Sequence, residues 1–133
     1  MGLIKYYVRE GKNPKSGAAQ YFGQNLPVSV VDINQLCEEV SHTTTVTKAD
    51  VLAILTETEH QFINLMRSNK SVRFGLLGSF RTTVQSTAAR LAEEFTRANI
   101  KRIAVRFTPT ASMKNQLKNG NPELSFVKQT PNE

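Results

Sequence analysis

The sequence predicts an α+β fold: an extra N-terminal β-hairpin, two helices, a small antiparallel sheet with a protruding arm, and a short C-terminal helix. Three observations predict this order. Two helix-capping patterns follow each other within residues 32–50, and alternating side chains mark strands at 79–85 and 100–108. A third alternating segment opens the chain. With 133 residues, 39% of them hydrophobic, the chain is long enough for one such domain with an appendage.

The hairpin is predicted within residues 1–27. Apolar and polar side chains alternate over residues 3–9, which is typical of a strand. Residues 11–17 are rich in turn-forming glycine, asparagine and proline, and residues 20–22 provide the returning strand. We therefore expect a hairpin over residues 3–24.

The two helices are predicted from their first residues. Asp32 is the expected N-cap of a helix over residues 33–41, and Gln35 completes a capping box. Thr47 caps a second helix in the same way. Apolar residues at helical spacing extend this second helix to about Ser68.

The rest of the chain predicts the sheet and its arm. Between the two main strands, residues 86–99 have the composition of a helix rather than a strand. Pro109 and Thr110 open a short helix that reaches about Lys118. Residues 124–128 are expected to form an edge strand.

The charge of the chain points to a polyanionic partner. Lysine and arginine number 17 against 11 acidic residues, so the net charge is +6 and the pI is near 9.7. Residues 79–133 alone carry nine bases and four acids. Charge concentrated in one part of the chain favours a binding face for nucleic acid or an anionic membrane surface.

Other classes of function are disfavoured. The single cysteine, Cys37, excludes an internal disulfide and a cysteine-based zinc site, and it is expected to be a small buried thiol. We find no metal motif, phosphate-binding glycine loop or nucleophile elbow, so we expect neither an enzyme nor a cofactor. No stretch is apolar enough to span a membrane and residues 1–8 do not form a secretory signal, which predicts a cytoplasmic protein.

Strand alternation predicts one basic sheet face. If the apolar sides of the two main strands face the core, Arg81, Arg102 and Arg106 fall together on the other side. Ser79 and Thr83 join them. Arginine and hydroxyl side chains suit contact with phosphate oxygens.

Two motifs carry a resemblance to a known family. Residues 72–80, Val-Arg-Phe-Gly-Leu-Leu-Gly-Ser-Phe, and residues 106–114, Arg-Phe-Thr-Pro-Thr-Ala-Ser-Met-Lys, resemble the sheet bend and last-helix entry of HU/IHF bacterial histone-like DNA-binding proteins. The hairpin and C-terminal tail resemble additions in HU-related proteins of Bacteroides-type bacteria. This resemblance implies an IHF-like DNA-binding domain over residues 28–119 and a tail over 120–133.

The resemblance also implies a function. It predicts a nucleoid-associated, architectural protein that binds and condenses double-stranded DNA as a homodimer without strong sequence preference. The expected contacts are basic or hydroxyl side chains of the sheet face, the arm and the last helix. They are Arg81, Thr83, Arg90, Arg97, Lys101, Arg102, Arg106, Lys114 and Lys118.

The arm departs from the family pattern. Family members carry Arg-Asn-Pro near the arm tip, where the proline inserts between base pairs. Here residues 86–99 contain no proline and include the acidic pair Glu93 and Glu94, so insertion by this arm is not expected. A similar sequence occurs instead in the N-terminal hairpin. It comprises Lys12, Asn13, Pro14 and Lys15, which we interpret as an ordinary turn, with a displaced wedge as the alternative.

Two alternatives to DNA binding remain open at this point. The arm could dock a protein partner through Leu91 and Phe95 on an apolar helical side, or the basic face could bind RNA. The homodimer also has an alternative, because burial within one chain would cover the same apolar residues. These residues are Phe62, Leu65, Leu76, Leu77 and Phe80.

Overall fold

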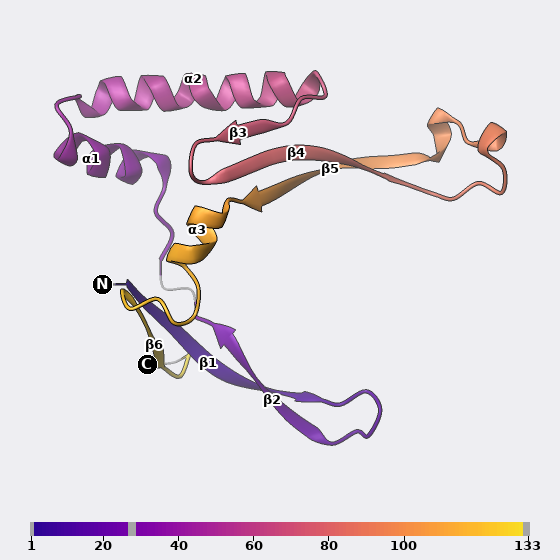
Figure 1. The fold of residues 1–133 in the computed structure, drawn as a ribbon, viewed down its shortest axis with the longest axis horizontal. Coiled ribbons are helices and arrows are strands. Elements are labelled where there is room, and N and C mark those ends of the chain that lie inside the picture. The colour runs from indigo at the N-terminus through magenta and orange to yellow at the C-terminus, as the bar shows by residue number, and fades with distance from the viewer. Residues whose placement is uncertain (1, 27–28, 132–133) are drawn as a thin grey trace. The chain divides into compact units, whose positions relative to one another are not determined.

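The structure is a computed structural model that describes residues 2–26 and 29–131. It divides into two compact units (Figure 1). The first, here called the hairpin unit, contains residues 1–31 and 116–133. The second, the helix–sheet unit, contains residues 32–115.

The hairpin unit is a three-stranded sheet in the order β2-β1-β6. Strand β1 (Gly2–Lys12) pairs antiparallel with β2 (Ala19–Asn25), which confirms the predicted hairpin. Strand β6 (Leu124–Lys128) is the predicted edge strand, and it pairs parallel to the first half of β1. The two ends of the chain therefore build one small sheet together.

The predicted helix caps are confirmed. Helix α1 spans Ile33–Thr43, and the Asp32 carboxylate accepts a hydrogen bond of 2.9 Å from the backbone N–H of Gln35. Helix α2 spans Lys48–Arg67 and begins with Thr47 as its N-cap. These caps satisfy backbone donors that the first turn of a helix leaves without partners.

The helix–sheet unit contains a second, antiparallel sheet in the order β3-β4-β5. Its strands are β3 (Val72–Phe74), β4 (Gly78–Ser86) and β5 (Ile100–Pro109). Strands β4 and β5 continue beyond β3 as a long two-stranded arm (Figure 1). The last helix, α3, spans Ala111–Gln116 and is shorter than the sequence predicts.

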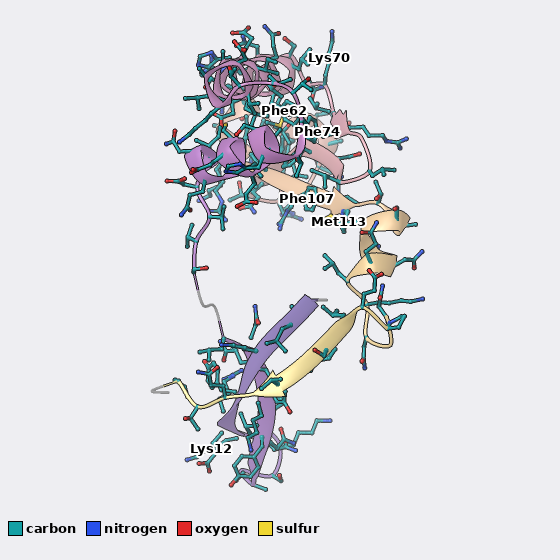
Figure 2. The ribbon with its side chains drawn as sticks, turned by 90° about the vertical axis from the view of Figure 1, so that its left-hand side faces the viewer. Lys12, Phe62, Lys70, Phe74, Phe107 and Met113 are labelled. Atoms are coloured by element: carbon teal, nitrogen blue, oxygen red, sulfur yellow. The ribbon has the colours of Figure 1, made fainter. Side chains whose placement is uncertain are left out.

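Aromatic rings join α2 to one face of this sheet. Phe62 of α2 lies edge-on to Phe74 and Phe80, with 5.5 Å between ring centroids in each pair. The ring centroids of Phe80 and Phe107 of β5 also lie 5.0 Å apart. Figure 2 marks Phe62, Phe74 and Phe107 of this cluster. Such pairs add to the gain from apolar burial, so this cluster fixes α2 on the sheet.

The prediction of a helix within residues 86–99 is wrong. The arm tip contains only two single 3-10 turns, η1 (Ala92–Glu94) and η2 (Arg97–Asn99). The Asn99 side chain accepts from the Thr96 backbone N–H at 2.9 Å and donates to the Thr87 hydroxyl at 3.0 Å. A short segment with no packing surface cannot offset the cost of starting a helix, and these local bonds replace the helical ones.

Gly78 offers a direct test of the packing between β4 and β5. A Cβ atom there would collide with the Thr108 carbonyl oxygen and lie 2.7 Å from the Phe107 ring. We expect Gly78→Ala to lower the free energy of unfolding by about 1–3 kcal/mol in urea titrations, the range for overpacked cores. Gly23→Ala is the matched control, since its Cβ would meet only Tyr6 at 3.9 Å. Equal effects of the two substitutions would contradict this packing.

Candidate nucleic-acid interface

The strand pairing gathers the predicted arginines on one face. Residues directly opposite each other in an antiparallel pair point to the same side of the sheet. Arg81 lies opposite Arg106, Gln85 opposite Arg102, and Arg73 opposite Ser79. All of these point away from the Phe80 side that α2 covers. The set that we call the basic sheet face comprises Arg73, Ser79, Arg81, Thr83, Gln85, Arg102 and Arg106.

The pairing of Arg81 with Arg106 is unfavourable for the isolated sheet. Like charges directly opposite each other destabilise a strand pair. Both side chains are exposed, and among the described residues neither has a carboxylate oxygen within 4.0 Å. An anion placed between the two guanidinium groups would relieve this repulsion. The arrangement therefore favours a bound polyanion over a merely hydrated sheet.

The helix–sheet unit separates its charges between two layers. Residues 32–67, which form α1 and α2, contain two basic and six acidic residues. Residues 68–115, which form the sheet, arm and α3, contain nine basic and two acidic residues. A net charge of −4 thus lies on the helices and +7 on the sheet side. This polarity directs a polyanion to the sheet side.

Hydrogen bonding within the basic sheet face orients one arginine. The Nε atom of Arg102 donates to the side-chain oxygen of Gln85 on the neighbouring strand. This bond holds the guanidinium group across the two strands while its terminal amino groups keep their donors. Planar forked donors of this kind match the geometry of phosphate oxygens.

The structure distributes the remaining predicted contacts over four places. Arg90 and Arg97 are exposed in the arm tip, Lys101 lies at the bulge of β5, and Lys114 is exposed on α3. Lys118 does not lie one helical turn beyond Lys114, because α3 ends at Gln116 and Lys118 belongs to the hairpin unit.

Arg73 is the residue that the sequence prediction missed. It occupies the middle of the three-residue strand β3, between Val72 and Phe74. The alternation of apolar, basic and aromatic side chains was the available signal. Pairing with Ser79 places Arg73 on the same face as Arg81.

The loop containing Lys12, Asn13, Pro14 and Lys15 lies at the exposed end of the N-terminal hairpin. The Asn13 side chain accepts a hydrogen bond of 2.8 Å from the backbone N–H of Lys15, which closes a turn around Pro14. The Gly17 backbone has a φ of 70°, a conformation that glycine adopts without strain. This geometry matches an ordinary turn.

Substitution of Pro14 distinguishes the turn from a wedge. Because we interpret Pro14 as a turn residue, we expect Pro14→Ala to keep DNA affinity and DNA bending within about twofold of the wild-type values. The hairpin should lose about 0.4–1 kcal/mol of local stability through the more flexible unfolded chain. Bending is measured by energy transfer between dyes at the two ends of a duplex. A lost bend with retained stability would support the wedge.

The helix–sheet unit leaves much apolar surface uncovered. Among the described residues only Cys37 and Val51 are buried hydrophobic residues, so the predicted buried thiol is confirmed. Leu76 is 72% exposed and Leu77 48% exposed, while Phe62 is half-buried. The apolar face of strands β4 and β5, which was expected to face the core, is also uncovered along the arm. Val84 of β4 and Ile103 and Val105 of β5 are exposed there.

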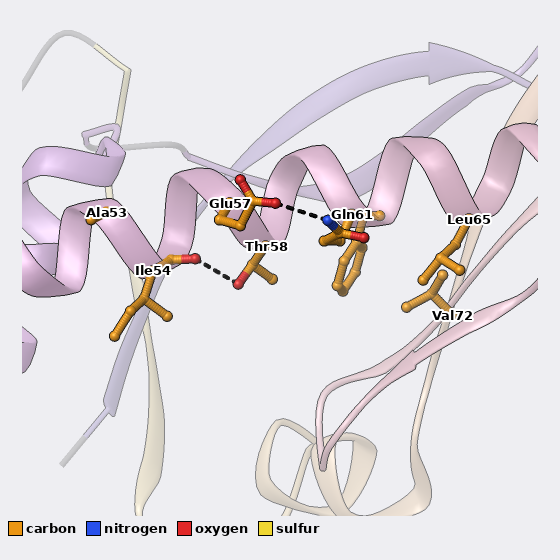
Figure 3. A pocket seen from close by; sticks show the side chains of 8 residues that line it. Ala53, Ile54, Glu57, Thr58, Gln61, Leu65 and Val72 are labelled. Atoms are coloured by element: carbon orange, nitrogen blue, oxygen red, sulfur yellow. Dashed lines mark hydrogen bonds between the residues drawn. The ribbon is translucent and has the colours of Figure 1, made fainter.

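A groove along α2 continues this apolar surface. Ile54, Phe62 and Leu65 of α2 form its apolar lining together with Val72 of β3 (Figure 3). Polar side chains lie along its edge, where Gln61 donates a hydrogen bond of 2.8 Å to Glu57. A groove of this composition suits an apolar protein surface rather than a charged ligand.

Neither a metal-binding cluster nor a membrane-spanning helix is found among the described residues. Within residues 2–26 and 29–131, no three histidine, cysteine, aspartate or glutamate residues lie close enough together to hold a metal ion. In the same residues, no helix has both the length and the apolar character needed to cross a membrane.

Comparison with known families identifies the chain. The family described as "HU domain fused to wHTH, Ig, or Glycine-rich motif" matches residues 3–123. The chain belongs to this HU-domain family. The match includes the hairpin unit down to β6 as well as the helix–sheet unit. No curated protein sequence matches this HU-domain chain.

Solved structures support the fold of the HU-domain chain. A Bacteroides vulgatus protein, provisionally described as a bacterial DNA-binding protein, has a TM-score of 0.69 and 12% identity over 98% of this chain. This chain spans about half of that protein, 51% of its length. Anabaena HU, solved in complex with DNA, has a TM-score of 0.52 and 18% identity over 65% of this chain and 97% of its own. These similarities show an α+β fold of the HU type.

Proposed function

We propose that this HU-domain chain is an architectural protein that binds duplex DNA through the phosphate backbone. The observation that carries the proposal is the basic sheet face, on which Arg81 and Arg106 lie directly opposite each other without a neighbouring carboxylate among the described residues. Membership of the HU-domain family and the similarity to Anabaena HU support duplex DNA as the polyanion.

The active form in this proposal is a homodimer of the IHF-like type, in which the sheets and arms of both copies together form one DNA-binding surface. Two copies of the helix–sheet unit would cover each other's grooves along α2 and the exposed Leu76 and Leu77. Each copy would contribute a basic sheet face and one arm to the DNA. The exposed apolar side chains of Val84, Ile103 and Val105 on the sheet support this assembly.

Recognition of DNA is proposed to depend on shape rather than base sequence. Arginine, serine and threonine on a sheet contact phosphate oxygens, and these contacts carry no direct sequence information. The side chains of α2 that face the sheet are occupied in packing, as Phe62 illustrates. The deformability of the duplex would then determine where the protein binds. In a bacterium this activity belongs to the nucleoid, where it would contribute to DNA condensation.

A salt titration tests the proposal. If a dimer engages roughly 6–8 phosphates, the logarithm of the affinity for a 30-base-pair duplex should fall against the logarithm of salt with a slope of about −5 to −7. A duplex RNA of equal length, measured in parallel, distinguishes DNA from RNA binding. We expect micromolar or tighter binding to DNA at low salt. Undetectable binding at low salt would exclude the proposed function.

A protein-interaction module is the second candidate, and one observation favours it. Leu91 is 58% and Phe95 42% exposed at the arm tip, on either side of the acidic pair Glu93 and Glu94. Acidic side chains repel phosphates, so this tip is better suited to a protein than to a DNA groove. Because residues 86–99 do not form a helix, however, Leu91 and Phe95 do not share the apolar helical side that was predicted.

A further inference from the structure

The hairpin unit is as basic as the helix–sheet unit although it is much smaller. Residues 1–31 and 116–133 contain six basic and three acidic residues, a net charge of +3 in 49 residues. The helix–sheet unit contains eleven basic and eight acidic residues, also +3, in 84 residues. The sequence alone does not reveal these equal net charges, because Lys118 and Lys128 lie far from residues 1–31 in the chain and belong to the hairpin unit only once the chain is folded.

Part of the hairpin projects as a two-stranded ribbon. Strand β6 pairs with β1 only from Gly2 to Tyr6. Beyond Tyr6, residues 7–12 of β1 pair with residues 19–24 of β2 and with no third strand among the described residues of the hairpin unit (Figure 1). These two segments and the loop between them are here called the hairpin ribbon. A two-stranded β-ribbon is one of the elements that the major groove of duplex DNA admits.

The end of the ribbon is held in one conformation. The Asn13 backbone N–H donates to the Ala18 carbonyl at 2.9 Å, and the Gly17 N–H donates to the Asn13 carbonyl at 2.8 Å. The Asn13 side chain accepts from Lys15 N–H at 2.8 Å. Fewer conformations are then lost when the loop meets a ligand, which lowers the entropic cost of binding.

The three basic residues of the ribbon have different surroundings. The Arg9 guanidinium lies 5.6 Å from the centre of the Phe22 ring on the opposite strand, so it also stabilises the ribbon. Lys12 and Lys15 are exposed, and no carboxylate oxygen of a described residue lies within 4.0 Å of their ammonium groups. Glu10 is the one acidic residue of the ribbon.

We propose that the hairpin ribbon is a second contact surface for the phosphate backbone of duplex DNA, separate from the basic sheet face. Lys12 and Lys15 supply the charge, and the amide side chains of Gln20 and Gln24 supply neutral donors along the same ribbon. This inference rests on the proposed function, because it takes the same duplex as ligand. It assigns DNA contact to a unit other than the one that carries the basic sheet face.

Charge reversal at the ribbon tip tests the inference in the full chain. We expect Lys12→Glu with Lys15→Glu to weaken binding to the 30-base-pair duplex at least tenfold near 0.1 M salt. The salt slope should become shallower by about 2 for each chain bound, since each lost phosphate contact removes about 0.9. The matched control is Lys48→Glu with Lys70→Glu, which makes the same change of charge at the first residue of α2 and in the turn that follows α2, and it should stay within about twofold of the wild type.

The outcomes separate the two proposals. If the wild type binds and the ribbon variant binds equally well, the hairpin ribbon is not a contact surface, whereas the proposed function stands. If the ribbon variant binds weakly and the control variant does not, the inference is supported. If the wild type itself binds no duplex, both proposals fall. Circular dichroism melting checks the fold of each variant, and all four substituted lysines are exposed.

Discussion

Reversing the charges of Arg102 and Arg106 is expected to weaken duplex DNA binding more than 100-fold near physiological salt. Two phosphate contacts would be lost from each chain and four from a dimer. At about 0.9 for each contact, the slope of log affinity against log salt should become shallower by roughly 3.6. The new carboxylates would also repel the duplex. Fluorescence anisotropy of a labelled 30-base-pair duplex, measured from low to high salt, gives both quantities.

Arg106→Glu alone should keep the fold, which distinguishes lost contacts from lost structure. Arg106→Glu places a carboxylate opposite Arg81 and turns a repulsive strand pair into an attractive one, worth about 0.2–1 kcal/mol. Urea titration should therefore show Arg106→Glu to be at least as stable as the wild type. Lys48→Glu with Lys70→Glu again controls for net charge. Full DNA binding by the Arg102 and Arg106 double variant would remove the basic sheet face as the binding site.

The helices and main strands could be predicted because their signals are local. The Asp32 capping box lies within four residues and forms as expected. Alternation along residues 79–85 and 100–108 assigned Arg81 and Arg106 to one face, and the strand pairing places them opposite each other. Signals of this kind need no knowledge of the distant chain.

The remaining features depend on contacts that a local pattern does not contain. The parallel pairing of β6 with β1 joins residues more than 100 positions apart, and no local rule selects β1 as the partner. At the arm tip, a local signal was present but did not form the structure that it indicates. Its helix-forming composition does not produce an α-helix, because Asn99 bonds to Thr87 and Thr96 and the exposed side chains of the tip gain no packing energy to offset helix nucleation.

Two residues of the candidate site show where prediction from the sequence fails: a very short strand and the end of a helix. Arg73 was missed because a three-residue strand gives too short an alternation to assign a face. Lys118 was wrongly placed on α3 because a helix end is decided within a few residues, and here the helix ends at Gln116. The shared face of Arg81, Arg102 and Arg106 was predicted correctly, since the alternation in these long strands is sustained.

Leu77→Asp is expected to abolish the proposed homodimer and to lower the stability of the helix–sheet unit. Leu77 is 48% exposed in the single chain, yet its backbone is fixed by bonds of 3.1 Å to Phe74 and Thr110. In a monomer this substitution would change stability by less than about 0.5 kcal/mol, as exposed substitutions do. In a dimer interface it would leave an unpaired carboxylate in apolar surroundings, at a cost of several kcal/mol.

Leu91→Asp at the arm tip is the matched control, because Leu91 is 58% exposed and lies outside the proposed interface. Sedimentation equilibrium should give the wild type and Leu91→Asp twice the chain mass, and their Tm should rise with protein concentration, as linkage requires for a dimer. Leu77→Asp should sediment as a monomer and unfold at a lower temperature. A wild type that sediments at 14.8 kDa, with Leu77→Asp as stable as Leu91→Asp, would show that the uncovered apolar surface serves another partner.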